Sequence, residues 1–191
     1  MAMNILLLDN YDSFTFNLLQ LLSEAGASKV SVIRNDESVM DAAMAADAVV
    51  ISPGPGLPRQ AGKIMELISA LGSSKRILGV CLGLQAIAEV YGGQLFHTGE
   101  ILHGEKALVQ PEAPFHPVFA GMENGFEAGL YHSWAVQKAG LPEVLRITAT
   151  DGRGVIMGLC HRNYDVCGVQ FHPESIMTPM GERMMRNWLR G

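Results

Sequence analysis

The first half of the chain alternates between short apolar runs and segments whose apolar residues recur every three or four positions. The runs of strand length cover residues 3–9, 29–35, 47–52 and 76–80. The periodic segments cover residues 13–26, 37–46, 63–72 and a stretch after residue 81. Strands that alternate with helices of this length predict βαβ units and a mostly parallel sheet.

The second half of the chain changes character. Short extended segments, separated by Gly, Pro and Asn turns, are predicted at 106–111, 126–136, 144–150, 155–161 and 166–171. Such segments favour antiparallel hairpins added to the sheet. A last helix is predicted over 181–190, and no linker or repeat divides the chain. We therefore expect one α/β domain over residues 1–191, with a mixed, mostly parallel sheet flanked by helices and antiparallel additions in its second half.

The first predicted helix carries signals at both of its ends. Asp12 or Ser13 is placed to cap its start, and Gly26 to close it. Caps explain the polar residues beside Tyr11 better than catalysis does.

Composition narrows the class of protein. The 191 residues are 48% hydrophobic and 17% charged, with a net charge of −5, which argues against disorder and against a nucleic-acid partner. No apolar run reaches the roughly 18 residues of a membrane span, and no secretion signal is visible, so we expect a cytoplasmic protein without a membrane partner. The three cysteines form no CxxC pair and the histidines no HExxH motif, so no metal site is expected; Cys160 and Cys167 are predicted to be buried.

A cysteine stands where the fourth predicted strand meets the following helix. The stretch Gly79-Val80-Cys81-Leu82-Gly83 has a glycine two residues on either side of Cys81, as in the nucleophile elbow of hydrolases. A sharp turn projects the sulfur out of the sheet, and a helix N-terminus lowers a thiol pKa. The backbone N–H of Leu82 would then face a developing oxyanion. The alternative is a buried cysteine with two incidental glycines.

A second candidate pair lies in "GVQFHPES". His172 and Glu174 are two residues apart, so in an extended backbone they share a face and the carboxylate reaches the imidazole. This arrangement predicts a general base, His172, oriented by Glu174. Taken alone, the motif also fits a surface loop without chemistry.

The loop "SPGPGLP" at 52–58 lacks the spacing of phosphate-binding motifs. It is interpreted either as a rigid Pro/Gly turn or as a source of a second oxyanion donor. Among the histidines, His132 is a weaker candidate for pocket support. The remaining four are assigned structural or solvent-facing positions: His97, His103, His116 and His161.

Together these segments resemble a known family. "PGPG", "GVCLGLQAIA", "YHSWAV" and "GVQFHPES" occur in the order and spacing of class I (triad) glutamine amidotransferases. "DNYDSFTFNL" and "HPESIMTPMGERMMRNWL" are similar to the small subunits of anthranilate synthase and aminodeoxychorismate synthase. The resemblance covers essentially the whole chain.

The resemblance implies a role for each matching residue. Cys81 would attack the glutamine amide and form a thioester, with His172 as base and then acid, and Glu174 orienting it. Backbone N–H groups of Leu82 and Gly56 would hold the oxyanion. The residues implied for the glutamine pocket are Gly54, Pro55, Gly56, Gln85, Ser133 and Trp134. The chain itself would need no cofactor, whereas a synthase partner is expected to use Mg²⁺.

Three features depart from the usual family pattern. Leu84 stands where many members have histidine, and Trp134 where a smaller apolar residue or tyrosine is commoner, which is expected to narrow the pocket. "LHGEKALV" at 102–109 replaces a commoner run.

The predicted function is a glutaminase subunit that passes ammonia to a chorismate-using synthase, first of all anthranilate synthase of tryptophan biosynthesis. The small subunit of aminodeoxychorismate synthase, or a subunit shared by both, stays open. A γ-glutamyl peptide hydrolase or a stress protein of the same scaffold is disfavoured by Gln85 and Glu174 together. A catalytically dead regulatory partner is disfavoured by the intact triad.

Overall fold

Eleven strands and five α-helices make up the described part of this computed structural model, residues 3–191. The strands are β1 (Asn4–Asp9), β2 (Lys29–Arg34), β3 (Ala48–Ile51), β4 (Arg76–Val80), β5 (Leu95–His97), β6 (Glu105–Pro111), β7 (Phe126–Leu130), β8 (Trp134–Val136), β9 (Leu145–Asp151), β10 (Ile156–His161) and β11 (Val166–Val169). The helices are α1 (Thr15–Ala25), α2 (Val39–Ala45), α3 (Ile64–Leu71), α4 (Leu82–Val90) and α5 (Gly181–Arg190), with 3₁₀ turns η1 (Pro58–Gln60) and η2 (Pro117–Phe119).

Nine of the strands form one mixed sheet, in the order β2-β1-β3-β4-β11-β10-β9-β6-β7. The run from β2 to β11 pairs in parallel, and the run from β11 to β7 pairs antiparallel. Strands β5 and β8 form a separate antiparallel pair. The predicted α/β class with antiparallel additions is therefore confirmed. The assignment of residues 1–191 to a single domain stays a prediction, and residues 1–2 lie outside the described residues.

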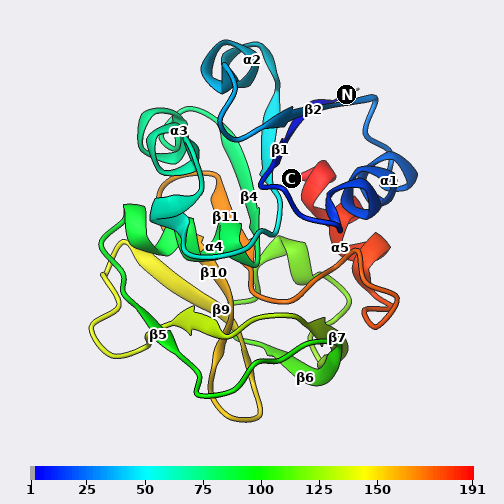
Figure 1. Cartoon of the computed structure of the whole chain (residues 1–191). Coiled ribbons are helices and arrows are strands. Elements are labelled where there is room, and N and C mark those ends of the chain that lie inside the picture. The colour runs from blue at the N-terminus through cyan, green and yellow to red at the C-terminus, as the bar shows by residue number, and fades with distance from the viewer. Residues whose placement is uncertain (1–2) are drawn as a thin grey trace.

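Helices cover the parallel part of the sheet on both faces (Figure 1). Along β1, Ile5 and Leu7 pack in a core with residues of α1 and α5, whereas Leu6 and Leu8 pack with residues of α2, α3 and α4. Successive side chains of a strand point to opposite faces, so an uninterrupted apolar run is what a strand covered on both sides requires. This burial explains why β1, β3 and β4 could be found from the sequence. Strand β2 lies at the edge of the sheet, is only partly buried, and was found from its alternation instead.

One pairing in this sheet decides where the chemistry lies. Strand β11 runs parallel to β4, with Val169 opposite Val80. The carboxyl ends of both strands therefore meet at one edge, although about ninety residues separate them in the chain. Cys81 follows one strand and the 170–174 segment follows the other. Ligands of open α/β sheets bind at this kind of edge.

Two local predictions were wrong in detail. Helix α1 begins after Phe14, and no side chain caps it; the Asp12 carboxylate instead accepts the N–H of Phe14 at 2.8 Å, in the turn before the helix. Gly26 does close the helix, with φ of 109°. The extended segment predicted at 126–136 is two strands, β7 and β8, which belong to different sheets. The residues between them, 131–133, turn toward the edge that holds Cys81.

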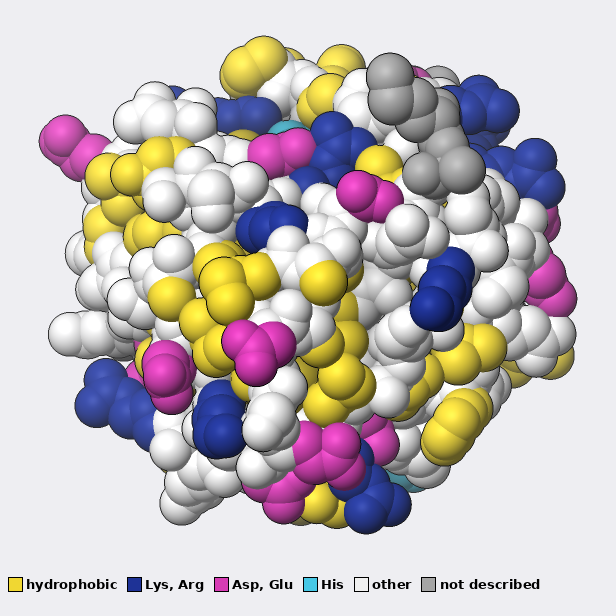
Figure 2. Space-filling view, turned by 90° about the horizontal axis from the view of Figure 1, so that it is seen from above, with side chains coloured by type: hydrophobic (Ala, Val, Ile, Leu, Met, Phe, Trp, Pro, Cys, Tyr) yellow, Lys and Arg dark blue, Asp and Glu magenta, His cyan; other side chains and the backbone are white. Residues whose placement is uncertain are grey.

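The surface around α2 carries charges of both signs. Figure 2 shows Lys, Arg, Asp and Glu side chains scattered among apolar and neutral ones on this face, without a continuous basic field. Within residues 3–191, none of the helices has the length and apolar character needed to cross a bilayer.

Candidate active site

Cys81 occupies the joint between β4 and α4 in a strained backbone conformation. Its φ of 53° and ψ of −101° are rare for a residue with a side chain. Two hydrogen bonds hold the turn: the Cys81 N–H donates to the carbonyl of Val169 at 2.8 Å, and the Gln85 N–H donates to the carbonyl of Cys81 at 3.1 Å. The sharp strand-to-helix turn predicted from the sequence is therefore present.

The glycines on either side of Cys81 are required by contacts between backbones. A Cβ on Gly79 would lie 2.5 Å from the carbonyl oxygen of Gly83, and a Cβ on Gly83 would lie 2.7 Å from the carbonyl oxygen of Ile51. Neither position has room for a side chain, since these neighbours are backbone atoms that cannot move aside. The interpretation of the two glycines as incidental is excluded.

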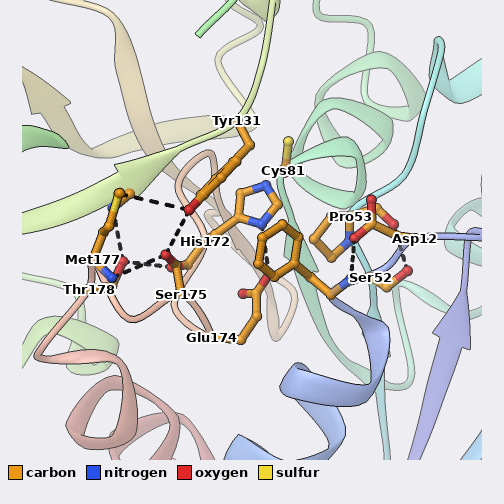
Figure 3. A network of polar contacts seen from close by, with 12 residues as sticks. Asp12, Ser52, Pro53, Cys81, Tyr131, His172, Glu174, Ser175, Met177 and Thr178 are labelled. Carbon is orange, nitrogen blue, oxygen red and sulfur yellow. Dashed lines mark hydrogen bonds and ion pairs between the residues drawn. The ribbon is translucent and has the colours of Figure 1, made fainter. Parts of the chain in front are cut away.

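His172 and Glu174 form the predicted pair. Oε1 of Glu174 lies 2.7 Å from Nδ1 of His172, and both side chains are buried. A carboxylate oxygen can only accept, so Nδ1 carries the proton and donates. Figure 3 shows the imidazole ring between Glu174 and the sulfur of Cys81. Within the described residues, Nε2 of His172 has no hydrogen-bond partner, which leaves this atom free for chemistry beside the sulfur.

The charge state of His172 follows from these neighbours. Burial lowers the pKa of His172, but the neighbouring Cys81 and Glu174 outweigh it and raise the pKa to about 10. The imidazolium form is therefore favoured at neutral pH, and a positive charge lies next to the sulfur.

Aromatic side chains pack against the His172 ring. The Tyr131 ring lies 4.8 Å from that of His172 between centroids, and its hydroxyl is 3.1 Å from Oγ of Ser175. Phe14 contacts both rings. Neither Phe14 nor Tyr131 was selected from the sequence, where Phe14 only continues an amphipathic helix and Tyr131 an extended segment.

A pocket of about 180 Å³ opens at the sulfur of Cys81. It brings together the residues predicted to line a substrate site, which are Gly54, Pro55, Gly56, Gln85, Ser133 and Trp134. His103, which was expected to be structural or solvent-facing, also lines it, as does His132. A second pocket, of about 210 Å³, contains Cys81 as well and is lined by His172 and Phe14. Cys81 is therefore reached from two hollows.

Two backbone N–H groups are available for an oxyanion near the sulfur. Leu82 is the first residue of α4, where the N–H has no partner within the helix. Gly56 has φ of 75°, which favours glycine. In the described range, neither N–H donates a hydrogen bond to another backbone group or to a side chain.

A chain of amide contacts runs from the pocket to the sulfur. Nε2 of Gln85 donates to the carbonyl of Trp134 at 2.8 Å and to Oε1 of Gln170 at 3.2 Å. Nε2 of Gln170 lies 3.5 Å from Sγ of Cys81. Gln170 belongs to "GVQFHPES" but was not selected as a site residue. The only available signal was its position two residues before His172.

His132, in the wall of this pocket, is buried. Burial lowers its pKa to about 4, and its Nδ1 lies 3.0 Å from the carbonyl of Trp134. The ring is therefore neutral at pH 7 and supports the turn that carries Ser133.

The departures from the family pattern occupy different surroundings. Leu84 is fully buried in a core cluster with Ala88 and Val136, so it makes no contact with the pocket chemistry. The Trp134 ring packs edge-on against His97 at 5.2 Å. Of the 102–109 segment, Leu102 and His103 line the pocket.

The two remaining cysteines lie away from this site. Cys160 and Cys167 face each other across β10 and β11, and both are buried, as predicted. Burial raises the pKa of both thiols. Cys81 is thus the cysteine that two pockets reach.

The chain is similar to known proteins in sequence and in fold. The chain is 41% identical to anthranilate synthase component 2 of Pseudomonas aeruginosa over 197 residues, which take in 97% of this chain and 94% of that protein. It is also 41% identical to the bifunctional protein TrpGD of Thermotoga maritima over 97% of its own length, but it spans only 32% of that protein. Its fold matches the crystal structure of a protein from Thermoplasma acidophilum, described as a GMP synthase subunit, with a TM-score of 0.87 and 23% identity, over 100% of this chain and 94% of the other. Residues 6–191 match the family described as glutamine amidotransferase class-I, and the chain belongs to that family.

Proposed function

We propose that this chain hydrolyses the side-chain amide of L-glutamine through a thioester on Cys81 and delivers the ammonia to a chorismate-using synthase subunit. One observation carries the proposal. A strained, pocket-facing cysteine, a buried histidine–glutamate pair and two free backbone N–H groups converge at one edge of the sheet.

In the first step, the Cys81 sulfur attacks the carboxamide carbon of glutamine. The oxyanion that forms is stabilised by the N–H groups of Leu82 and Gly56. The carbon–nitrogen bond then breaks as His172 gives a proton to the leaving nitrogen, and ammonia departs. Glu174 stabilises the imidazolium and keeps Nε2 directed at the reacting atoms.

In the second step, water attacks the thioester carbon. Neutral His172 takes a proton from the water, the carbon–sulfur bond breaks, and the sulfur recovers its electron pair while glutamate leaves. The thioester divides one difficult amide hydrolysis into two easier steps, because sulfur is a strong nucleophile and a good leaving group.

The pocket beside Cys81 is the proposed glutamine site. Gly54, Pro55 and Gly56 line it from the loop after β3, and Ser133 and Trp134 line it from the turn before β8. The amide nitrogen of Gln85 donates hydrogen bonds to Trp134 and Gln170. The amide oxygen of Gln85 is therefore the atom left to accept a hydrogen bond from the substrate.

The acceptor of ammonia is proposed to be a separate synthase subunit. The relative from Pseudomonas aeruginosa, which this chain nearly spans, is named as a component of anthranilate synthase. This supports the tryptophan branch, with chorismate and Mg²⁺ bound by the large subunit rather than by this chain. A cytoplasmic location is part of the same proposal.

The test is product formation by the assembled complex of this chain with an anthranilate synthase large subunit. Cys81→Ser is expected to abolish anthranilate formation from glutamine while formation from added ammonium salt continues at the wild-type rate. Equal loss of both activities would contradict this division of labour.

A further inference from the structure

Within the described residues, one side chain outside the predicted triad forms a hydrogen bond to the sulfur of Cys81, and it is Gln170. It follows β11, is fully buried, and its Nε2 lies 3.5 Å from Sγ of Cys81. An N–H to sulfur separation of this size fits a hydrogen bond. Gln170 does not line the pocket proposed for glutamine. Its contact is therefore with the sulfur rather than with the substrate.

The orientation of the Gln170 amide is fixed by its neighbours. The carbonyl oxygen of Trp134 can only accept, so the atom of Gln85 that lies 2.8 Å from it is the amide nitrogen. The same nitrogen lies 3.2 Å from the Gln170 amide, where only oxygen can accept. The other end of that amide, which faces Cys81, must then be the nitrogen. Gln170 is an obligatory donor toward the sulfur.

We propose that Gln170 is a further catalytic residue, whose amide N–H stabilises the thiolate of Cys81 and fixes the direction of its sulfur. The proposal rests on the function proposed above, in which Cys81 is the nucleophile. Donors to a charged acceptor form stronger hydrogen bonds than donors to a neutral one. The low exposure of Cys81, 5%, makes such a donor more valuable than it would be in water.

Gln170 and His172 act differently on the same sulfur. His172 carries a proton that it gives to the leaving ammonia and recovers from water. The Gln170 amide keeps its protons throughout and takes part in no transfer. Its hydrogen bond is strongest when the sulfur carries negative charge, as it does when the carbon–sulfur bond of the thioester breaks. Gln85 is a positioning residue in this scheme, since it turns the donor toward Cys81.

Two substitutions in the assembled complex test the proposal. Gln170→Leu removes the donor and fills the position with an apolar side chain. Gln170→Glu replaces the amide nitrogen with an oxygen in a side chain of nearly the same shape. The first readout is the second-order rate of Cys81 alkylation by iodoacetamide at pH 7, with the adduct mapped by peptide mass. We expect the rate to fall about ten- to a hundred-fold in Gln170→Leu, and further in Gln170→Glu, where a carboxylate would repel the thiolate.

The second readout separates this role from a merely structural one. The kcat for glutamine hydrolysis is expected to fall in the same variants, and in the same order, as the alkylation rate. The KM for glutamine should stay within about two-fold of wild type, because Gln170 does not line the pocket. Thermal unfolding identifies which variants fold. If Gln170→Leu does not fold, Gln170→Glu still tests the proposal.

Wild-type alkylation rates in a folded variant, or a change in KM alone, would overturn the role of Gln170 and leave the proposed function standing. A wild-type complex without glutamine turnover and without alkylation at Cys81 would overturn both.

Discussion

The ring of Phe14 packs edge-on against the imidazole of His172, with 5.2 Å between the ring centroids and 68° between their planes. Glu174 holds the imidazole through Nδ1, and the rings of Phe14 and Tyr131 pack against it. The direction of Nε2 is therefore determined by contacts from three separate segments of the chain. Rigid support of this kind keeps a proton donor in line with the bond that it serves.

Phe14→Leu should lower kcat for glutamine hydrolysis about three- to ten-fold with little change in KM, because the imidazole gains freedom while the pocket is untouched. Phe16→Leu is the matched control, since Phe16 lies two residues on and is 66% exposed. Steady-state kinetics of both variants in the assembled complex make the comparison. Equal effects of the two substitutions would show that the contact with His172 is not important.

How far the sequence predicted this site depends on the range of each contact. The elbow at Cys81 and the pair His172–Glu174 are local patterns of residues, so each could be recognised within a few positions of the sequence. The position of Phe14 is not local. It depends on the pairing of β4 with β11 and on where the start of α1 lies relative to that edge.

Gln170 shows a second reason why sequence reasoning stopped short. Its residue type suggests no chemistry on its own, and its orientation is fixed by Gln85 and Trp134, which are distant in sequence. The prediction of one extended segment over 126–136 was wrong for a similar reason. Its alternation fits a strand throughout, yet the turn at 131–133 is held by contacts with Met177 and Leu102.

Gly79→Ala should destabilise the protein by about 1–3 kcal/mol or more, and remove glutaminase activity, because its Cβ would overlap the backbone of Gly83. Gly152→Ala is the control, since a Cβ there meets nothing within 4 Å. Urea unfolding at pH 7 measures both. A stable, active Gly79→Ala protein would contradict the close approach of the two backbones.

Glu174→Gln should change how stability depends on pH. The pKa of His172 is about 10, above its usual value of 6.5. Burial lowers this pKa, but Cys81 and Glu174 raise it by more than burial lowers it. The stability contributed by protonated His172 is thus present below pH 6.5 and lost as the pH rises toward 10. Removing the carboxylate should reduce this loss, so wild type and variant should converge at high pH.

Urea unfolding at pH 6.5 and 9.5 measures this effect. Glu127→Gln is the control, since Glu127 forms an exposed ion pair with Lys106 that contributes little in either condition. A destabilisation by Glu174→Gln that is the same at both pH values would argue against a charged His172 in the folded state.

A half-buried neutral histidine, His116, should make the protein sensitive to acid. Burial, with a smaller effect of Arg146, lowers the pKa of His116 to about 4, and its Nδ1 accepts the N–H of Val118 at 3.3 Å. Since the unfolded chain binds this proton first, stability should fall between pH 6.5 and 4 by about 1.4 kcal/mol for each pKa unit of difference.

His116→Asn keeps an acceptor at that position but does not titrate. Unfolding free energies at pH 7.5 and 4.5 should show a smaller acid loss in His116→Asn than in wild type. Parallel losses in the two proteins would mean that other groups cause the acid sensitivity.

The central claim is that Cys81 is the nucleophile of a formed glutamine site. The most direct measurement is intact-mass labelling of the assembled complex with an electrophilic glutamine analogue, with and without excess glutamine. The account predicts one adduct on this chain, mapped to Cys81 and prevented by glutamine. Labelling at another residue, or labelling of Cys81 that glutamine does not slow, would contradict it.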